Sequence, residues 1–230
     1  MDPTDGGDEP DAEDHRDDDP DAALDAVLAA YDLKDERRTG WQLRGVDDPE
    51  SVAAHSWGVA YLVAALGDRL AADLPGVDLD RALRLAVVHD VAEAETGDVA
   101  TRASDVAEAP TDSAGDGSDR EAKVAAEREA MRDLAGPLPE RVRDAWEAYE
   151  ARESPEAVLV KECDLLDTCL QALVYERDGR YDPERGPPDA FGEYDDLDEF
   201  FATAEPRLRT DAGRALFETV RERYRAARDR

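Results

Sequence analysis

Residues 82–99 have the sequence ALRLAVVHDVAEAETGDV, and this stretch decides the fold class. Leu85 and Ala92 recur at helical spacing, and His89 falls on the same apolar face. The pattern predicts a helix over residues 80–95, which the Thr-Gly-Asp sequence after it brings to an end. The sequence therefore places a histidine, followed at once by Asp90, on the apolar side of a helix.

The same periodicity continues along the chain in both directions, and neither strand alternation nor an internal repeat stands out. Further helices are expected over residues 22–33, 51–70, 119–134, 139–152, 155–177, 195–204 and 206–228. Stretches rich in Gly, Pro, Asp and Ser predict loops at 101–118 and 178–193. The predicted fold class is all-α, a compact helical bundle.

The net charge limits the partners of this chain. It has 230 residues, and 59 Asp+Glu against 28 Lys+Arg give a formal net charge of −31. Such a charge repels phosphate backbones and anionic lipids, so neither a nucleic acid polymer nor a membrane is an expected partner. No apolar stretch reaches the roughly 18 residues of a membrane span, and the acidic start does not resemble a signal peptide. Together with two thiols, Cys163 and Cys169, that are expected to be free, these features favour the reducing cytoplasm.

Two interpretations of the acidity compete. The chain is either a disordered acidic protein or a folded protein adapted to high intracellular salt, in which surface charges are screened over a few ångströms. The ordered apolar stripes favour the folded, halophilic interpretation. Residues 1–21, with 11 acids, one base and almost nothing apolar, are expected to form a disordered acidic tail. Residues 22–230 are then expected to form a single domain.

Both histidines outside the tail lie on apolar helix faces. His55 shares its face with Val59 and Leu62, as His89 does with the apolar residues of its own helix. A single histidine in such a position is most often a hydrogen-bonded core residue. Two of them, in a chain with three histidines in all, favour a shared site.

Carboxylates accompany these histidines. Asp90 adjoins His89, and Asp164 borders the apolar stripe of a third helix, although it could instead pair with Lys161 one turn earlier. A mixed set of histidine nitrogens and carboxylate oxygens suits a divalent transition metal such as Mn, Fe, Co, Ni or Zn, and ligand type does not select among these.

Two further acids, one arginine and one tryptophan complete the candidate site. Glu93, at i+4 from His89, could orient or deprotonate a water molecule, and Asp98 could brace it. The alternatives are a solvated helix acid and a turn residue. Arg38 suits bidentate phosphate binding, and Trp41 could either stack on a nucleotide or pack in the core.

These residues resemble a known family. The order His55, His89-Asp90, Asp164 resembles the HD-domain metal-dependent phosphohydrolases. The surrounding segments RTGW at 38–41, PESVAAHS at 49–56, ALRLAVVHDVAEAETGDV at 82–99 and EAVLVKECDLLDTCLQALVYE at 156–176 are similar to its 5′-deoxynucleotidase branch. The loop after Asp98 departs from the family pattern, with Val99-Ala100-Thr101-Arg102 where many relatives have a Thr-Pro stretch.

The resemblance implies roles for the candidate residues. It makes His55, His89, Asp90 and Asp164 the metal ligands, Glu93 and Asp98 the acidic pair near the attacking water, Arg38 the phosphate contact and Trp41 the aromatic residue near the sugar.

The resemblance also implies a function. The expected reaction is hydrolysis of (deoxy)ribonucleoside 5′-monophosphates to nucleoside and phosphate, with a preference for 2′-deoxy substrates. It is expected to require one divalent metal ion, often cobalt or manganese, in a homodimeric helical enzyme. The alternatives are a phosphodiesterase, a nucleoside tri- or polyphosphate hydrolase, and a non-catalytic metal- or nucleotide-binding protein on the same scaffold.

Overall fold

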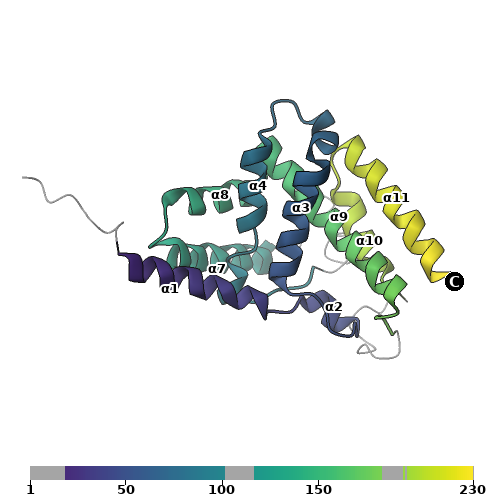
Figure 1. Cartoon of the computed structure of the whole chain (residues 1–230), viewed down its shortest axis with the longest axis horizontal. Coiled ribbons are helices and arrows are strands. Elements are labelled where there is room, and N and C mark those ends of the chain that lie inside the picture. Colours follow the sequence, from purple (N-terminus) through teal and green to yellow (C-terminus); the bar gives the residue numbers. More distant parts are fainter. Residues whose placement is uncertain (1–18, 102–116, 183–193, 195, 230) are drawn as a thin grey trace, which may run out of the picture.

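The computed structural model describes residues 19–101, 117–182, 194 and 196–229, and within them the regular secondary structure is helical (Figure 1). No strand occurs in these residues, which contain a single isolated bridge between Arg37 and Ser51. The all-α prediction is confirmed. The predicted acidic tail and the predicted loops at 101–118 and 178–193 fall largely outside the described residues.

The elements follow one another in a simple order. The α-helices are α1 (Pro20–Ala30), α2 (Thr39–Leu43), α3 (Val52–Leu70), α4 (Leu79–Val88), α5 (Glu93–Thr96), α7 (Gly117–Ala135), α8 (Glu140–Ala151), α9 (Pro155–Asp178), α10 (Asp198–Ala204) and α11 (Asp211–Arg228). The short 3-10 helices are η2 (Tyr31–Lys34), η3 (Ala71–Asp73) and η4 (Glu205–Arg207). The five-residue helix α2 was not predicted, and α10 and α11 begin later than expected.

Polar residues cap most of the long helices at their first turns. Each accepts a hydrogen bond from a backbone N–H that has no partner inside the helix, and thereby sets where the helix begins. These caps are Asp19 for α1, Ser51 for α3, Asp78 for α4, Ser154 for α9 and Thr210 for α11. Proline opens α1 and α9, where its missing N–H costs no hydrogen bond.

Helix α9 is the centre of the bundle. It packs against α3, α4, α8, α10 and α11, and Figure 1 shows it running behind α3 toward α11. Because neighbours cover it on several sides, α9 buries residues on more than one face, including Leu159, Val160 and Leu166. Cys163 and Cys169 are buried and free, as predicted.

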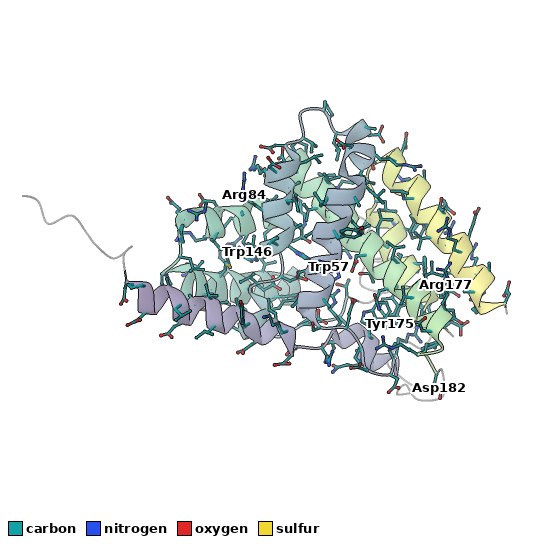
Figure 2. All side chains as sticks on the ribbon, viewed as in Figure 1. Trp57, Arg84, Trp146, Tyr175, Arg177 and Asp182 are labelled. Carbon is teal, nitrogen blue, oxygen red and sulfur yellow. The ribbon has the colours of Figure 1, made fainter. Side chains whose placement is uncertain are left out.

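One continuous core joins the two ends of the described chain. It contains Trp41 from α2, Val59 from α3, and Phe217 and Tyr224 from α11. A smaller cluster forms around Trp146 on α8, which lies between α8 and α7 (Figure 2). Helix α11 therefore takes part in the main core.

The predicted continuous helix over 80–95 is wrong. Helix α4 ends at Val88, residues 89–92 form turns, and α5 begins at Glu93. The backbone N–H of Val91 bonds to the carbonyl of Val88, and that of Glu93 to the carbonyl of Asp90, so the chain is wound more tightly than an α-helix. His89 and Glu93 therefore do not lie one turn apart on the same face of one α-helix, as their i+4 spacing predicted. The predicted end at Gly97 is confirmed, and this glycine has a φ of +73°.

The apolar stripe of the first helix is exposed. Leu24, Leu28 and Tyr31 keep 56%, 51% and 52% of their surface accessible, and Val27 keeps 41%. The small residue Ala26 is the one that α1 buries. The apolar residues of α1 recur at helical spacing, but no described part of this chain covers the face that they form.

Candidate metal centre

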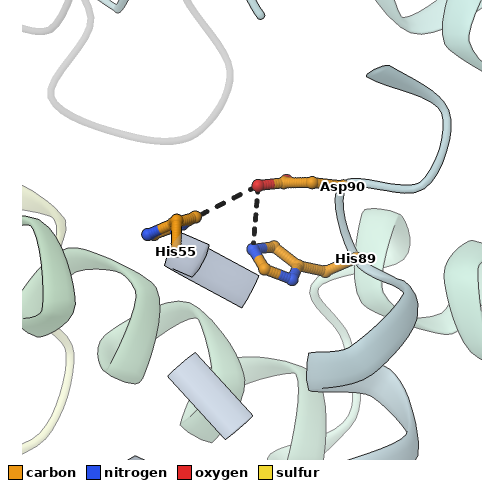
Figure 3. Close-up of side chains that lie close together, drawn as sticks. All are labelled: His55, His89 and Asp90. Atoms are coloured by element: carbon orange, nitrogen blue, oxygen red, sulfur yellow. Dashed lines mark ion pairs between the residues drawn. The ribbon is translucent and has the colours of Figure 1, made fainter. Parts of the chain in front are cut away.

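His55, His89 and Asp90 meet where α3 passes the end of α4. Nε2 of His89 lies 3.1 Å from Oδ2 of Asp90, and Nε2 of His55 lies 3.7 Å from the same oxygen (Figure 3). Both histidines are buried, at 1% and 3% exposure. The interruption after Val88 sets this geometry, because it places His89 and Asp90 at a helix end where their side chains can converge.

Second contacts orient both imidazole rings. Nδ1 of His89 lies 2.8 Å from the carbonyl oxygen of Ala86, which can only accept a hydrogen bond, so the ring proton is on Nδ1. Nδ1 of His55 lies 2.8 Å from Oδ2 of Asp167 and in the same way donates to that carboxylate. In the neutral form of both rings, which is the form that binds a metal, both Nε2 atoms present lone pairs toward the oxygen of Asp90.

The converging atoms lack hydrogen-bond partners. Nε2 of His55, Nε2 of His89 and Oδ2 of Asp90 are all buried and make no hydrogen bond in the structure. Three buried electron-rich atoms without a donor are costly and repel one another, and a cation between them would relieve both effects. These ligand atoms lie within 4.8 Å of one another, so the group can hold a metal ion.

Asp164 approaches the same place from α9. Its Oδ1 lies 3.2 Å from Nε2 of His55, while its Oδ2 accepts hydrogen bonds from Tyr149 Oη at 3.0 Å and from Lys161 Nζ at 2.6 Å. The predicted pairing with Lys161 is present, and the other oxygen of Asp164 faces His55. Burial opposes ionisation here, but the ammonium group of Lys161 holds the pKa of Asp164 well below its usual range.

Glu50 and Asp167 form a second carboxylate group around the opposite nitrogen of His55. That nitrogen carries the proton donated to Asp167, so it has no lone pair for a second ion. The carboxylates instead orient the ring. Burial raises the pKa of Glu50, whose carboxylate also accepts a 3.0 Å hydrogen bond from Trp41 Nε1.

Glu93 lies near Asp90 and Asp98, and one of its carboxylate oxygens makes no hydrogen bond. It is 7% exposed, and its Oε2 has no hydrogen-bond partner. Burial, followed by repulsion from Asp90 and Asp98, raises its pKa to about 9. At this pKa the carboxyl group is protonated at neutral pH, and a cation bound beside it would lower the pKa and free the carboxylate to accept a proton.

Asp98 holds the segment that carries Arg38. Its carboxylate accepts hydrogen bonds from the backbone N–H of Thr39 at 2.5 Å and from the guanidinium of Arg38 at 3.1 Å. Arg38 also lies 3.6 Å from Asp90, and its side chain is 19% exposed. The structure thus places Asp98 against Arg38 and Thr39 and brings a partly accessible guanidinium to the site.

Trp41 lies in the core. It is 2% exposed and packs edge-on against Tyr175 and closely against Phe200. Its ring has no free face on which a nucleotide could stack. Trp41 is therefore a core residue, as the second alternative predicted, and the predicted contact with the sugar is wrong. Trp41 reaches the site indirectly, through its hydrogen bond to Glu50.

Tyr149 and Glu50 were not recognised from the sequence. Tyr149 packs edge-on against the ring of His89 as well as bonding to Asp164. Tyr149 lies on the apolar face of α8, so the sequence pattern indicates a core residue and gives no sign of a polar contact. Only the packing of α8 on α9 and α4 reveals these contacts.

We expect Gly58→Ala to weaken metal binding about 10- to 100-fold, which is typical when a residue behind a ligand is lost. A Cβ at Gly58 would overlap Oδ1 of Asp167, and this carboxylate could then no longer hold His55. Metal affinity measured by competition with a chelator checks the effect.

Gly67→Ala is the matched control in the same helix. Its new Cβ would meet only the flexible end of Leu79, at 2.9 Å, so metal affinity should be retained. Equal affinity in the Gly58 variant and the wild-type protein would contradict the orienting role of Asp167.

The all-α bundle and its histidine–aspartate group define a class of helical protein with side chains that can hold a metal ion where α3 passes the end of α4. The HD domain family model matches residues 30–199, and this chain belongs to that family.

Individual relatives support the assignment. A 5′-deoxynucleotidase HDDC2 from Danio rerio is 32% identical over 83% of this chain and 82% of its own length. The protein of the same name from Mus musculus is 38% identical over 63% of this chain, and the match spans 65% of that relative.

Solved structures agree with the fold. The PH0347 protein from Pyrococcus horikoshii OT3 superposes with a TM-score of 0.62 and 29% identity, over 88% of this chain and 98% of its own. A protein described as a predicted metal-dependent phosphohydrolase from Magnetospirillum magnetotacticum MS-1 superposes with a TM-score of 0.59 over 90% of this chain and 91% of its own. At 22% identity it supports the fold alone.

Proposed function

We propose that this protein is a metal-dependent phosphomonoesterase that hydrolyses nucleoside 5′-monophosphates, preferably 2′-deoxy ones, to nucleoside and phosphate. The carrying observation is the set of three buried atoms without partners, on His55, His89 and Asp90. Membership of the HD domain family and relatives named 5′-deoxynucleotidase support the substrate class.

The proposed ligands are His55, His89, Asp90 and Asp164, around one divalent ion such as cobalt or manganese. A bound ion there would supply Lewis-acid stabilisation of the phosphate and a lower pKa for the attacking water. The chain itself fixes the ligands, through Asp167 behind His55 and through Tyr149 and Lys161 behind Asp164.

The remaining groups handle the proton and the substrate charge. Glu93 accepts a proton from water through its free Oε2 while the water oxygen attacks phosphorus in line. The bond from phosphorus to the 5′ oxygen breaks, and the nucleoside leaves with the proton that Glu93 accepted from the water. Arg38 binds the phosphate oxygens, and Asp98 holds Arg38 in place.

Phosphate release tests this function. Deoxy- and ribonucleoside 5′-monophosphates should be compared with Co²⁺, Mn²⁺ and Mg²⁺ at molar salt, because a charge of −31 needs screening. We expect release of phosphate, fastest from deoxy substrates. Hydrolysis of diesters or release of pyrophosphate or polyphosphate alone would favour another HD activity, and nucleotide binding without turnover with any metal would contradict an enzyme.

Arg38→Lys is expected to lower kcat/KM at least about tenfold, mainly through KM. A lysine keeps the charge but loses the planar pair of donors that matches a phosphate. Steady-state kinetics measure the change. The neighbour Arg37, whose side chain is 43% exposed, provides the control Arg37→Lys, and equal losses in the two variants would contradict a specific contact by Arg38.

The exposed stripe of α1 supports the proposed homodimer. Leu24, Leu28 and Tyr31 form one apolar face, and a second copy of this face would bury it across a twofold axis. We expect light scattering to give the mass of a dimer and Leu28→Asp to give that of a monomer. A wild-type protein that stays monomeric across concentrations and at high salt would contradict the interface.

The proposed location of this protein is the cytoplasm. No helix in the described residues is long and apolar enough to cross a membrane. Two buried free thiols support a reducing, cytoplasmic location. Cell fractionation that finds the protein in the exported fraction would contradict it.

A further inference from the structure

A second cluster of charged side chains lies beside α9, around a small hollow in the surface. Four of its six lining residues are cations, namely Arg152, Lys161, Arg207 and Arg209. They come from three separate segments, the end of α8, helix α9 and the connection from η4 to α11. Four cations around one hollow are unexpected in a chain that has 59 acids and only 28 bases.

The acids nearby are engaged elsewhere. Glu162, which also lines the pocket, accepts two backbone N–H groups at 2.7 Å, from Arg209 and Thr210, and the hydroxyl of Thr210. Its carboxylate is therefore used to start α11. Arg152 pairs with Glu150 at 3.3 Å.

Arg207 differs from its neighbours. Among the described residues, no hydrogen bond or ion pair joins its guanidinium to another side chain, although it is only partly exposed. Positive charges gathered at one pocket repel one another, and a bound anion of more than one charge would offset that repulsion. Guanidinium groups bind tetrahedral oxyanions especially well, because two N–H donors match two oxygens.

We propose that this pocket is an oxyanion site, separate from Arg38, for a phosphate group that is either free phosphate or part of a small molecule. It lies behind Asp164 as seen from His55. One oxygen of Asp164 faces His55, and the other binds Lys161, whose side chain lines the pocket. An anion in the pocket therefore competes with Asp164 for the ammonium group of Lys161.

Titration of the metal-free full-length protein tests the site. The protein is stripped with a chelator, and inorganic phosphate is added at constant ionic strength while heat or ³¹P line width is followed. We expect one saturable site, weakened at least tenfold by Arg207→Gln and also weakened by Arg209→Gln. Titration with deoxyadenosine 5′-monophosphate in parallel shows whether the pocket also accepts a phosphate within a nucleotide, and binding of either anion that depends on Arg207 supports the proposal.

Two controls separate this pocket from the proposed active site. Arg177→Ala removes an exposed charge near the far end of α9 (Figure 2) and should leave phosphate binding unchanged. Arg38→Lys should also leave it unchanged, because Arg38 does not line the pocket. Circular dichroism confirms that each variant is folded. Unchanged binding in folded Arg207→Gln and Arg209→Gln, or a loss caused by Arg38→Lys instead, would overturn the proposal, as would the absence of saturable binding in the wild-type protein.

Discussion

His89→Ala is expected to remove the bound metal and to lower kcat/KM by about 10³-fold or more. The loss corresponds to the several kcal/mol that a metal ion contributes to stabilising a phosphoryl transition state. His89 supplies one of three buried atoms that converge without partners, and its ring is fixed by the carbonyl of Ala86. Alanine offers no ligand atom and leaves Asp90 without its nearest neighbour.

Two measurements check this expectation together. Metal content per chain should fall from near one to background, and phosphate release should fall with it. Asp90→Ala should behave alike, because Oδ2 of Asp90 faces both histidines. His15→Ala is the matched control, since His15 is the one histidine outside the proposed site and belongs to the acidic N-terminal segment. Full activity and full metal content in both site variants would refute the proposed metal centre.

Glu93→Gln is expected to lower kcat by about 10²- to 10⁴-fold while metal remains bound, the range typical for loss of a general base. The amide has nearly the same shape but cannot accept a proton from water. Since Glu93 is not among the proposed ligands, metal content should stay near the wild-type value.

The comparison of kcat with metal content distinguishes this variant from those at His89 and Asp90. Glu95→Gln is the matched control, because Glu95 lies two residues further along α5 and is exposed. It should keep wild-type kinetics. A Glu93→Gln enzyme with unchanged kcat would exclude Glu93 as the base, and one that loses its metal would indicate a ligand or folding role instead.

Much of the helical architecture could be predicted from local sequence. The helices around His55 and Asp164 appear within a few residues of their expected bounds, because apolar periodicity and capping residues act over a turn or two. The apolar faces also predicted that His55 and His89 point inward, and both are buried.

Other features depended on contacts that the local pattern does not contain. Residues 89–92 have a helical pattern but form turns, and the shared helix face inferred for His89 and Glu93 disappears with them. Trp41 was compatible with stacking or with packing, and its neighbours Tyr175 and Phe200, far along the chain, decide for packing. Residues 22–33 were predicted to be helical, and the exposure of the apolar residues Leu24 and Leu28 is visible only in the structure.

The all-α class, the positions of the principal helices and the residue types available for a metal site could be inferred from the amino-acid sequence alone. These follow from periodicity, caps and side-chain chemistry, which are properties of neighbouring residues. Only the tertiary structure decided which atoms face one another. It turned both Nε2 atoms toward Asp90, divided the two oxygens of Asp164 between His55 and Lys161, and brought Tyr149 behind them. The physical reason is that such orientations depend on hydrogen bonds between helices distant in sequence, which exist only once α3, α4, α8 and α9 have packed together.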